Sequence, residues 1–251
     1  MMHYLFSPAS REVLPRLARE RTLCAFDFDG TLSPIVDNPG QAGLGTQTRV
    51  LLCQLAALYP CVIVSGRARA DLLERLAGIH VERAIGNHGA EMEVAPSGPT
   101  TPMVAEWKAS LTRELGVIPG LWVEDKGLSL AVHYRHSSHK PEVRRRILTA
   151  ARNLAHVRIV GGKQVVNLMP DRATNKGEAV AAERERLKCD WTLFVGDDEN
   201  DEDAFALDGN VVGVRVGRKV RSHARYYLRT QAEVDRLLEH LVQLRAPAQP
   251  A

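Results

Sequence analysis

The chain has 251 residues, 45% hydrophobic and 25% charged, which is enough to bury the core of one domain carrying a smaller insertion. A net charge of +3 is too small to indicate a nucleic-acid partner, and we expect the basic residues between Arg215 and Arg229 to form a solvated face. No run approaches the ~20 apolar residues of a membrane span, so we expect no membrane partner either.

Five short apolar runs predict the strands of a mostly parallel sheet. Each is nearly continuous in apolar residues, as expected of strands buried on both faces, and each ends at small or polar residues. The runs are Thr22–Phe26, Cys61–Val64, Ala84–Ile85, Trp191–Val195 and Val211–Val216. The helical patterns between them are Arg49–Leu58, Leu72–Leu76 and Ala179–Leu187. Strands that alternate with helices predict an α/β fold, an open sheet with helices on both sides.

The middle of the chain has a different pattern, which predicts an inserted α+β domain over residues 101–170. A helix, a hairpin, a second helix and a second hairpin follow one another, which favours a small antiparallel sheet with two helices on one face. The expected segments are Met103–Leu115, Leu121–Lys126, Leu128–Arg135, Pro141–Leu154, Val157–Val160 and Val165–Met169. We expect hairpin turns at Gly127 and at Gly161-Gly162. The core domain then comprises residues 1–100 and 171–251.

The polar residues of most interest stand directly after predicted strands. Open α/β sheets bind ligands outside the carboxyl ends of their strands, so we expect these side chains to converge on one site. They are Asp27, Asp29, Ser65, Arg67, Asn87, His88, Asp197 and Asp198.

The first group, Asp27-Phe28-Asp29-Gly30-Thr31, has the pattern of a metal-dependent reaction centre. Asp27 and Asp29 are two positions apart, so both carboxylates face the same way on an extended segment. Two such carboxylates repel unless a proton or a cation intervenes, and Mg²⁺, which prefers oxygen ligands, meets that need. The alternative is a strand end with solvated acids and a turn glycine, but DxDGT after an apolar strand favours the reaction centre.

A second acidic cluster, Gly196–Asp203, follows another apolar run. The dipole of a helix beginning there explains Glu202 and Asp203, but it does not explain a Gly-Asp-Asp segment at the strand end. Two acidic clusters at adjacent strand ends indicate a divalent-cation site. A calcium loop is excluded, because no DxDxDG ladder with a glutamate at its twelfth position is present.

Two segments are candidates for binding phosphate. Ser65-Gly66-Arg67 opens a helix, where a hydroxyl and free N–H groups bind anions, although serine is also a common helix cap. Asn175 and Glu178 resemble a capping box, which places Lys176 in the first helical turn. A lysine there opposes the helix dipole, which favours pairing with an anion such as a phosphate or Asp27. A solvent-exposed lysine is the commoner arrangement for such a residue taken alone.

In combination these segments resemble the four motifs of the haloacid dehalogenase superfamily of phosphatases. The resemblance implies a Rossmann-like core with an inserted αββαββ cap domain. It implies that Asp27 attacks phosphorus to form an aspartyl-phosphate, and that Asp29 serves as acid and then as base. Asn200 and Asp201 are expected to orient these groups. The implied Mg²⁺ ligands are Asp27, Asp29, Asp197 and Asp198, and the implied phosphate contacts are Thr31, Ser65, Gly66, Arg67 and Lys176.

Within this superfamily the chain is similar to trehalose-6-phosphate phosphatases. The similarity is carried by Asp27–Pro34, Ser65–Arg67, Gly86–Glu91, Glu124–Gly127, His133–Arg135 and Gly196–Phe205. It implies that Glu124 and Lys126 contact the sugar. Asn167 stands where the family usually has a glutamate; its amide can bind a hydroxyl but carries no charge. The full set of expected substrate contacts is Asn87, His88, Glu124, Lys126, His133, Arg135 and Asn167.

The expected activity is Mg²⁺-dependent hydrolysis of trehalose 6-phosphate to trehalose and phosphate. The alternatives are a phosphatase for another phosphosugar (sucrose phosphate or a glycosyl-glycerate phosphate), a phosphosugar mutase on the same scaffold, and a non-catalytic phosphosugar sensor. The four cysteines lack CxxC spacing, which indicates a reducing compartment, and Met1–Ser10 lacks the pattern of a signal peptide. We therefore expect a cytoplasmic protein, and we expect it to be a monomer.

Overall fold

The computed structural model describes residues 2–37, 39–92 and 100–246. These residues form two compact units. The core unit runs up to Met92, continues from Asn175 to Asp197 and resumes at Asp201. The insert unit contains the residues up to Thr174, together with Asp198–Asn200.

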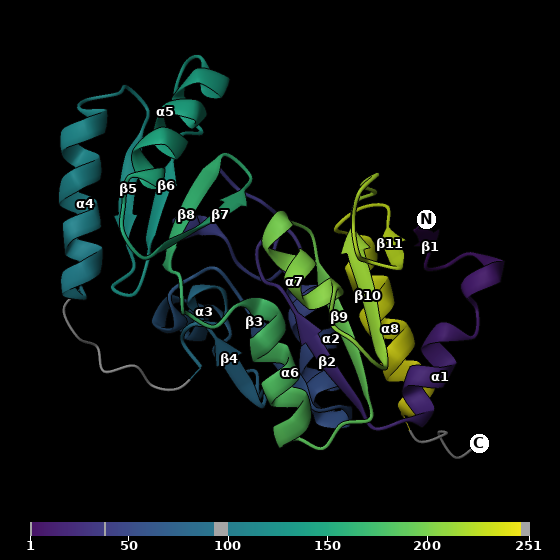
Figure 1. Ribbon diagram of the computed structural model, residues 1–251. Coiled ribbons are helices and arrows are strands. Elements are labelled where there is room, and N and C mark those ends of the chain that lie inside the picture. Colours follow the sequence, from purple (N-terminus) through teal and green to yellow (C-terminus); the bar gives the residue numbers. More distant parts are fainter. Residues whose placement is uncertain (1, 38, 93–99, 247–251) are drawn as a thin grey trace. The chain divides into compact units, whose positions relative to one another are not determined.

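In the described part of the core unit, seven parallel strands form one sheet in the order β1-β11-β10-β9-β2-β3-β4 (Figure 1). They are β1 (His3–Tyr4), β2 (Thr22–Phe26), β3 (Cys61–Val64), β4 (Arg83–Ile85), β9 (Trp191–Gly196), β10 (Val211–Val216) and β11 (Tyr226–Leu228). β2 and β3 are buried along their whole length, as their apolar sequences predict. The mostly parallel sheet expected from the sequence is confirmed.

Helices cover both faces of this sheet. They are α1 (Val13–Arg19), α2 (Thr46–Leu58), α3 (Arg69–Arg75), α6 (Lys176–Arg186), α7 (Glu202–Phe205) and α8 (Glu233–Arg245). Alternate residues of β2 take part in two separate apolar clusters, because neighbouring side chains of a strand point to opposite faces. Cys24 and Phe26 pack with α1, α2 and α8, whereas Leu23 and Ala25 pack with α6 and α7.

The insert unit contains an antiparallel sheet in the order β5-β6-β8-β7, with α4 and α5 packed on one face. Its elements are α4 (Pro102–Leu115), β5 (Trp122–Asp125), β6 (Leu130–His133), α5 (Lys140–Arg152), β7 (Val157–Gly162) and β8 (Val165–Pro170). α4 begins where it does because the Thr101 hydroxyl accepts a hydrogen bond from Val104 N and Pro102 occupies the first turn. The predicted αββαββ plan is confirmed.

One predicted turn is wrong. Gly161 and Gly162 do not form the second hairpin turn but lie within β7, paired with Val166 and Val165. The chain reverses two residues later, where Gln164 adopts a φ of 65°. A glycine pair permits a turn but does not require one, since glycine is also accommodated within a strand.

Among the described residues, no helix combines the length and apolar character that crossing a membrane requires.

Candidate active site

The two acidic segments come together because they follow neighbouring parallel strands. β2 and β9 are paired, and Asp27 N donates to Val195 O across them at 2.9 Å. Carboxylate oxygens of Asp27, Asp197 and Asp201 all lie within 4.8 Å of one another. All three residues are buried. The convergence expected at the carboxyl ends of the strands is therefore present for these side chains.

Lys176 is the first residue of α6, and its side chain is only 1% exposed. The capping box of Asn175 and Glu178 begins the helix as predicted, with both hydrogen bonds at 2.9 Å. The Lys176 ammonium donates to Asp27 Oδ1 at 2.8 Å and to Asp201 Oδ1 at 2.7 Å. The alternative of a solvent-exposed lysine is excluded.

Asp201 and Arg215 hold the loop after β9. Asp201 Oδ2 accepts from Asp197 N at 2.8 Å, while its other oxygen accepts from Lys176. Arg215 donates to the carbonyl oxygen of Asp197 and, at 3.0 Å, to Glu202 Oε1. Arg215 was expected on a solvated face, and for this residue the expectation is wrong: it is 6% exposed and pairs in register with Gly196. The sequence held a signal for this burial, because Arg215 is the one charged residue in an otherwise apolar strand.

The charge balance of the cluster suits a divalent cation. Burial raises the pKa of Asp27 well above its usual range, Lys176 opposes this, and the carboxylates of Asp201 and Asp197 raise the pKa further. Three carboxylates against one ammonium leave two negative charges when all are ionised. Gly30, with a φ of 87°, keeps the space beside Asp197 open, because a Cβ there would collide with that carboxylate. The excess of negative charge and the oxygen donors of this cluster fit Mg²⁺, which prefers oxygen ligands.

Asp29 has a different environment from Asp27. Its side chain is 39% exposed, and both of its oxygens accept from the Arg67 guanidinium, at 2.7 and 2.6 Å. Arg67 also donates to Asp71 Oδ2 at 2.6 Å. The bidentate geometry fixes the orientation of the Asp29 side chain, and the Arg67 side chain that holds it is only 10% exposed.

Three more predicted residues of the core unit are buried near one another: Ser65, Asn87 and His88. Ser65 itself is fully buried, and its Oγ accepts from Arg67 N at 3.2 Å. The His88 ring occupies the space that a side chain at position 66 would fill, and Asn87 is fully buried. The buried Thr31 hydroxyl has no hydrogen-bond partner among the residues that the structure describes.

The insert unit arranges its predicted residues on the sheet face opposite its helices. Glu124, Ala131 and Asn167 are register partners across β5, β6 and β8. Leu130 and Leu168, one position along, pack under the helices. Residues of alternate parity point the other way, so Glu124 and Asn167 share the helix-free face.

Glu124 is the polar centre of that face. Its Oε2 lies 2.8 Å from His133 Nε2 and 3.8 Å from Lys126 Nζ. The His133 ring stacks on Trp122 with centroids 4.0 Å apart, and Trp122 was not singled out from the sequence. Arg135 follows β6. Asp198 and Asn200 group with the insert unit. The role of Asp198 as a metal ligand and that of Asn200 as an orienting residue stay predictions.

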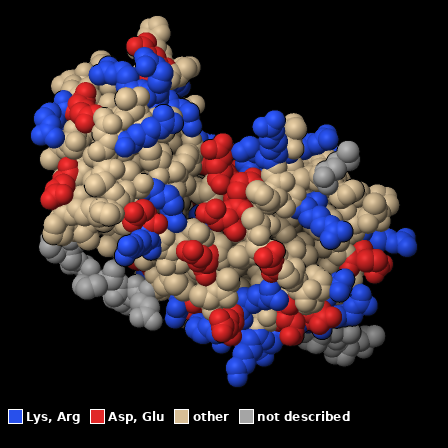
Figure 2. All heavy atoms as spheres, viewed as in Figure 1, with Lys and Arg blue, Asp and Glu red and all other residues tan. Residues whose placement is uncertain are grey.

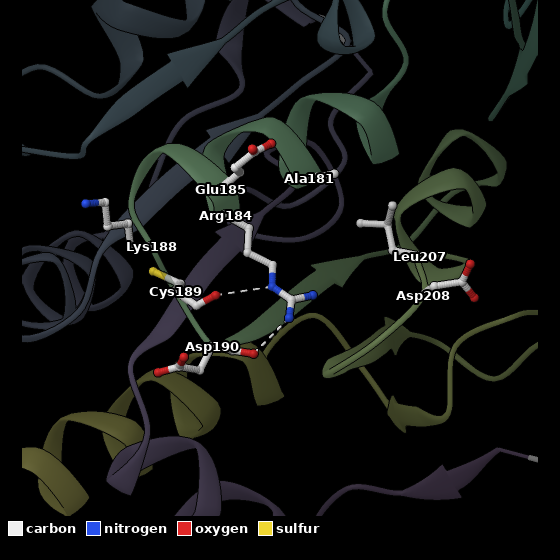
Figure 3. A pocket seen from close by; sticks show the side chains of 8 residues that line it. All are labelled: Ala181, Arg184, Glu185, Lys188, Cys189, Asp190, Leu207 and Asp208. Carbon is white, nitrogen blue, oxygen red and sulfur yellow. Dashed lines mark hydrogen bonds between the residues drawn. The ribbon is translucent and has the colours of Figure 1, made fainter.

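A cavity of about 420 Å³ lies at the end of β9 opposite the acidic cluster (Figure 3). Asp190 and Cys189 line it and precede β9, whereas Asp197 follows β9, so the strand separates this cavity from the acidic cluster. Arg184 donates to the main-chain oxygens of Cys189 and Asp190, at 3.2 and 2.9 Å, and so ties down the loop. On the molecular face in Figure 2, basic side chains are interspersed with acidic ones.

Comparisons of the sequence point to one family. The model of the trehalose-phosphatase family matches residues 25–230. The trehalose-phosphate phosphatase of Mycolicibacterium paratuberculosis is 34% identical over 253 residues, covering 94% of this chain and 61% of the relative. A probable trehalose-phosphate phosphatase 2 of Oryza sativa is 32% identical, covering 92% of this chain and 71% of the relative. The chain thus spans less than two thirds of the mycobacterial relative.

Solved structures share the fold. The C-terminal domain of the C. albicans trehalose-6-phosphate phosphatase superposes with a TM-score of 0.79 at 24% identity, covering 98% of each chain. A subclass IIB sugar phosphatase of the haloacid dehalogenase superfamily gives 0.61 at 15% identity, covering 87% of this chain and 98% of the other. With a family model spanning both acidic segments and the lysine between them, the chain belongs to the trehalose-phosphatase family.

Proposed function

We propose that this protein is a Mg²⁺-dependent phosphatase that hydrolyses trehalose 6-phosphate to trehalose and phosphate. The observation that carries the proposal is the buried cluster of Asp27, Asp197 and Asp201 with Lys176, in a chain whose relatives bear the name trehalose-phosphate phosphatase. A binding module has no need of a buried carboxylate nucleophile beside an acid or base such as Asp29. The cytoplasmic location and the monomeric state stay predictions.

Magnesium would be held by Asp27, Asp197 and the main-chain oxygen of Asp29, and when bound it would neutralise charge on the phosphoryl oxygens. Asp201 is already committed to Lys176 and to Asp197 N, so we assign it the part of orienting those two groups. Phosphoryl transfer depends mainly on positioning and on charge neutralisation, and these residues supply both.

The proposed reaction has two steps. A carboxylate oxygen of Asp27 attacks phosphorus, the bond from phosphorus to the sugar oxygen breaks, and Asp29 gives its proton to that oxygen. Asp29 then takes a proton from water, which attacks the aspartyl-phosphate and releases phosphate with Asp27 regenerated. A carboxylate nucleophile divides one difficult hydrolysis into two easier displacements. Lys176, Ser65 and Thr31 would bind the phosphoryl oxygens.

The ion pair with Arg67 orients Asp29. Two hydrogen bonds from the guanidinium hold both oxygens of the Asp29 carboxylate. For Asp29 to face the sugar oxygen in the first step, Arg67 has to release one of these oxygens when substrate binds. The phosphate group of the substrate offers Arg67 an alternative bidentate partner.

Sugar recognition is assigned to the helix-free face of the insert unit. Glu124, Lys126 and Asn167 place an acceptor, a cation and an amide along that face, as binding of many hydroxyls requires. His133 and Arg135 extend the set. The insert unit as a cap domain for substrate recognition is part of the same proposal.

The test is release of inorganic phosphate from a panel of phosphosugars with and without Mg²⁺. We expect trehalose 6-phosphate to be the preferred substrate, and Asp27→Asn to abolish turnover while the fold is kept. Asp190→Asn, at the opposite end of β9, is the matched control and should retain activity. Equal turnover of glucose 6-phosphate would contradict the substrate, and substantial activity in Asp27→Asn would contradict the nucleophile. Conversion without phosphate release would indicate a mutase instead.

A further inference from the structure

The segment Gly86–Glu91 is strained, although it contains no proposed reacting group. Asn87 and His88 have φ angles of 47° and 56°, and Gly89 follows with 108°. Residues other than glycine rarely adopt this left-handed backbone conformation, and here two adjacent buried residues do so. Such strain persists only where surrounding contacts hold it, and it concentrates at functional sites.

Those surrounding contacts tie the segment to the Ser65 loop. His88 N donates to Ser65 O at 2.9 Å, and Asn87 N donates to Arg67 O at 2.7 Å. The segment is therefore hydrogen-bonded to the residues on either side of Gly66. The His88 ring fills the space that only a glycine at position 66 leaves open. The main chain that carries the Ser65 hydroxyl is therefore set by this segment.

The same segment also reaches the start of α6. Gly89 packs against Asn175 O and Lys176 N, leaving no room for a Cβ. Lys176 is the residue whose ammonium binds Asp27 and Asp201. One short segment thus contacts both of the elements that present proposed phosphate ligands, Ser65 on one side and Lys176 on the other.

Glu91 closes the segment into a ring. Gly86 and Glu91 exchange two main-chain hydrogen bonds, at 3.1 and 3.2 Å. Glu91 Oε2 accepts from Asn87 Nδ2 at 2.9 Å and from Arg69 N at 2.7 Å, which fastens the ring to the first turn of α3. Arg67, the partner of Asp29, lies two residues before that turn.

We propose that Gly86–Glu91 is a positioning segment that sets the distance between Ser65 and Lys176, with Glu91 as the residue that holds its strained conformation. The inference rests on the proposed function, and it gives Asn87 and His88 a supporting role in place of direct substrate contact. Both residues act through Ser65 and Lys176, without touching the reacting atoms.

The first test compares two glycines of the core unit that share a left-handed backbone. Gly89→Ala introduces a methyl group against Asn175 and Lys176, whereas Gly78, with a φ of 82°, has open space around its Cβ position. We expect Gly89→Ala to lower kcat by about 100-fold, the cost of displacing a ligand by roughly 1 Å. Gly78→Ala also places an alanine at a left-handed φ, but without a steric contact, and it should keep the kcat of the parent protein.

The second test uses the carboxylate. Glu91→Gln keeps an oxygen that accepts from Asn87 and Arg69, so it should retain most of the activity that Glu91→Ala loses. Glu82→Ala, which removes a surface ion pair with Arg186, is the control for loss of a glutamate. A Glu91→Gln variant as impaired as Glu91→Ala would contradict the proposed role of Glu91.

The affinity for orthovanadate in the presence of Mg²⁺, measured by titration calorimetry, separates this inference from the proposed function. Gly89→Ala should weaken vanadate binding strongly and Gly78→Ala should not, whichever phosphosugar the parent protein hydrolyses. Equal vanadate affinity and equal kcat in the two alanine variants would overturn the positioning segment. Failure of the parent protein to hydrolyse trehalose 6-phosphate would overturn the substrate alone.

Discussion

Arg215 fixes the main chain that carries Asp197, one of the three carboxylates of the acidic cluster. It binds the main chain of Asp197 and pairs with Glu202, whose second oxygen accepts from Ser222 Oγ at 3.1 Å and from His223 N at 2.8 Å. The guanidinium therefore ties the loop after β9 to the segment after β10. Removing one member of a buried, hydrogen-bonded charge pair is costly, because the other is left without its partner.

We expect Arg215→Met to lower the free energy of unfolding by about 2 to 3 kcal/mol, the value of charged hydrogen bonds lost with a group left unsatisfied. Methionine keeps much of the side-chain length and removes only the donors. Urea unfolding measures the effect, and weaker Mg²⁺ binding should accompany it. Arg218→Met is the control: Arg218 is exposed, so its loss should stay within about 0.5 kcal/mol. Equal effects in both variants would show that Arg215 has no special role.

At the scale of elements, several hydrogen bonds join α2 and α8, among them one from the buried side chain of Tyr59. Tyr59, the residue after α2, donates its hydroxyl to Leu241 O in α8 at 3.0 Å, and the Arg245 guanidinium lies 4.2 Å from the Tyr59 ring centroid. Burial raises the pKa of Tyr59 to about 12. The neutral hydroxyl is thus the form that the folded protein favours.

This shift predicts a loss of stability at high pH. The unfolded pKa of tyrosine is about 10, so the contribution of Tyr59 is complete below pH 10 and is lost as the pH rises towards about 12. At pH 8 the parent protein should be more stable than Tyr59→Phe by about 1 kcal/mol, the value of the hydrogen bond. Chemical unfolding across pH 8 to 12 should show that advantage disappear. An advantage constant over this range would contradict a buried, titrating Tyr59.

At the scale of the whole molecule, the two units have separate apolar cores. The insert unit packs Trp107, Ile147 and Leu168 in a cluster of its own, whereas the acidic cluster belongs to the core unit. Chains with more than one core need not unfold in a single step. A ligand of one unit then stabilises that unit by mass action.

We expect Mg²⁺ at 100 times its dissociation constant to stabilise the core unit by about 2.7 kcal/mol and to leave the insert unit unchanged. Calorimetry should show one transition that moves with Mg²⁺ and one that does not. Asp197→Asn should remove the shift. Ile147→Ala, in the core of the insert unit, should destabilise only the insert unit, lowering its free energy of unfolding by about 2 to 5 kcal/mol. Only the transition that does not respond to Mg²⁺ should then move. A shift that survives in Asp197→Asn would place the cation elsewhere.

The sequence by itself determined the elements whose cause is local. β2, β3 and β10 follow from short apolar runs, and the start of α6 follows from the capping box of Asn175 and Glu178, because these depend on neighbours in the chain. The order of the acidic motifs likewise identified the family. Strand β1, at the edge of the sheet, and its neighbour β11 escaped prediction, because their two and three residues show too little of a pattern.

Only the tertiary structure decided which charges meet. Arg215 and the other basic residues up to Arg229 look alike in sequence. Arg215 alone among these basic residues is buried, because its strand pairs with β9 and brings it to Asp197. The bidentate bonds between Arg67 and Asp29, and the packing of Gly89 on Lys176, join residues 38 and 87 positions apart. Partners in a hydrogen bond are chosen by distance in space, and chain order fixes that distance only within an element.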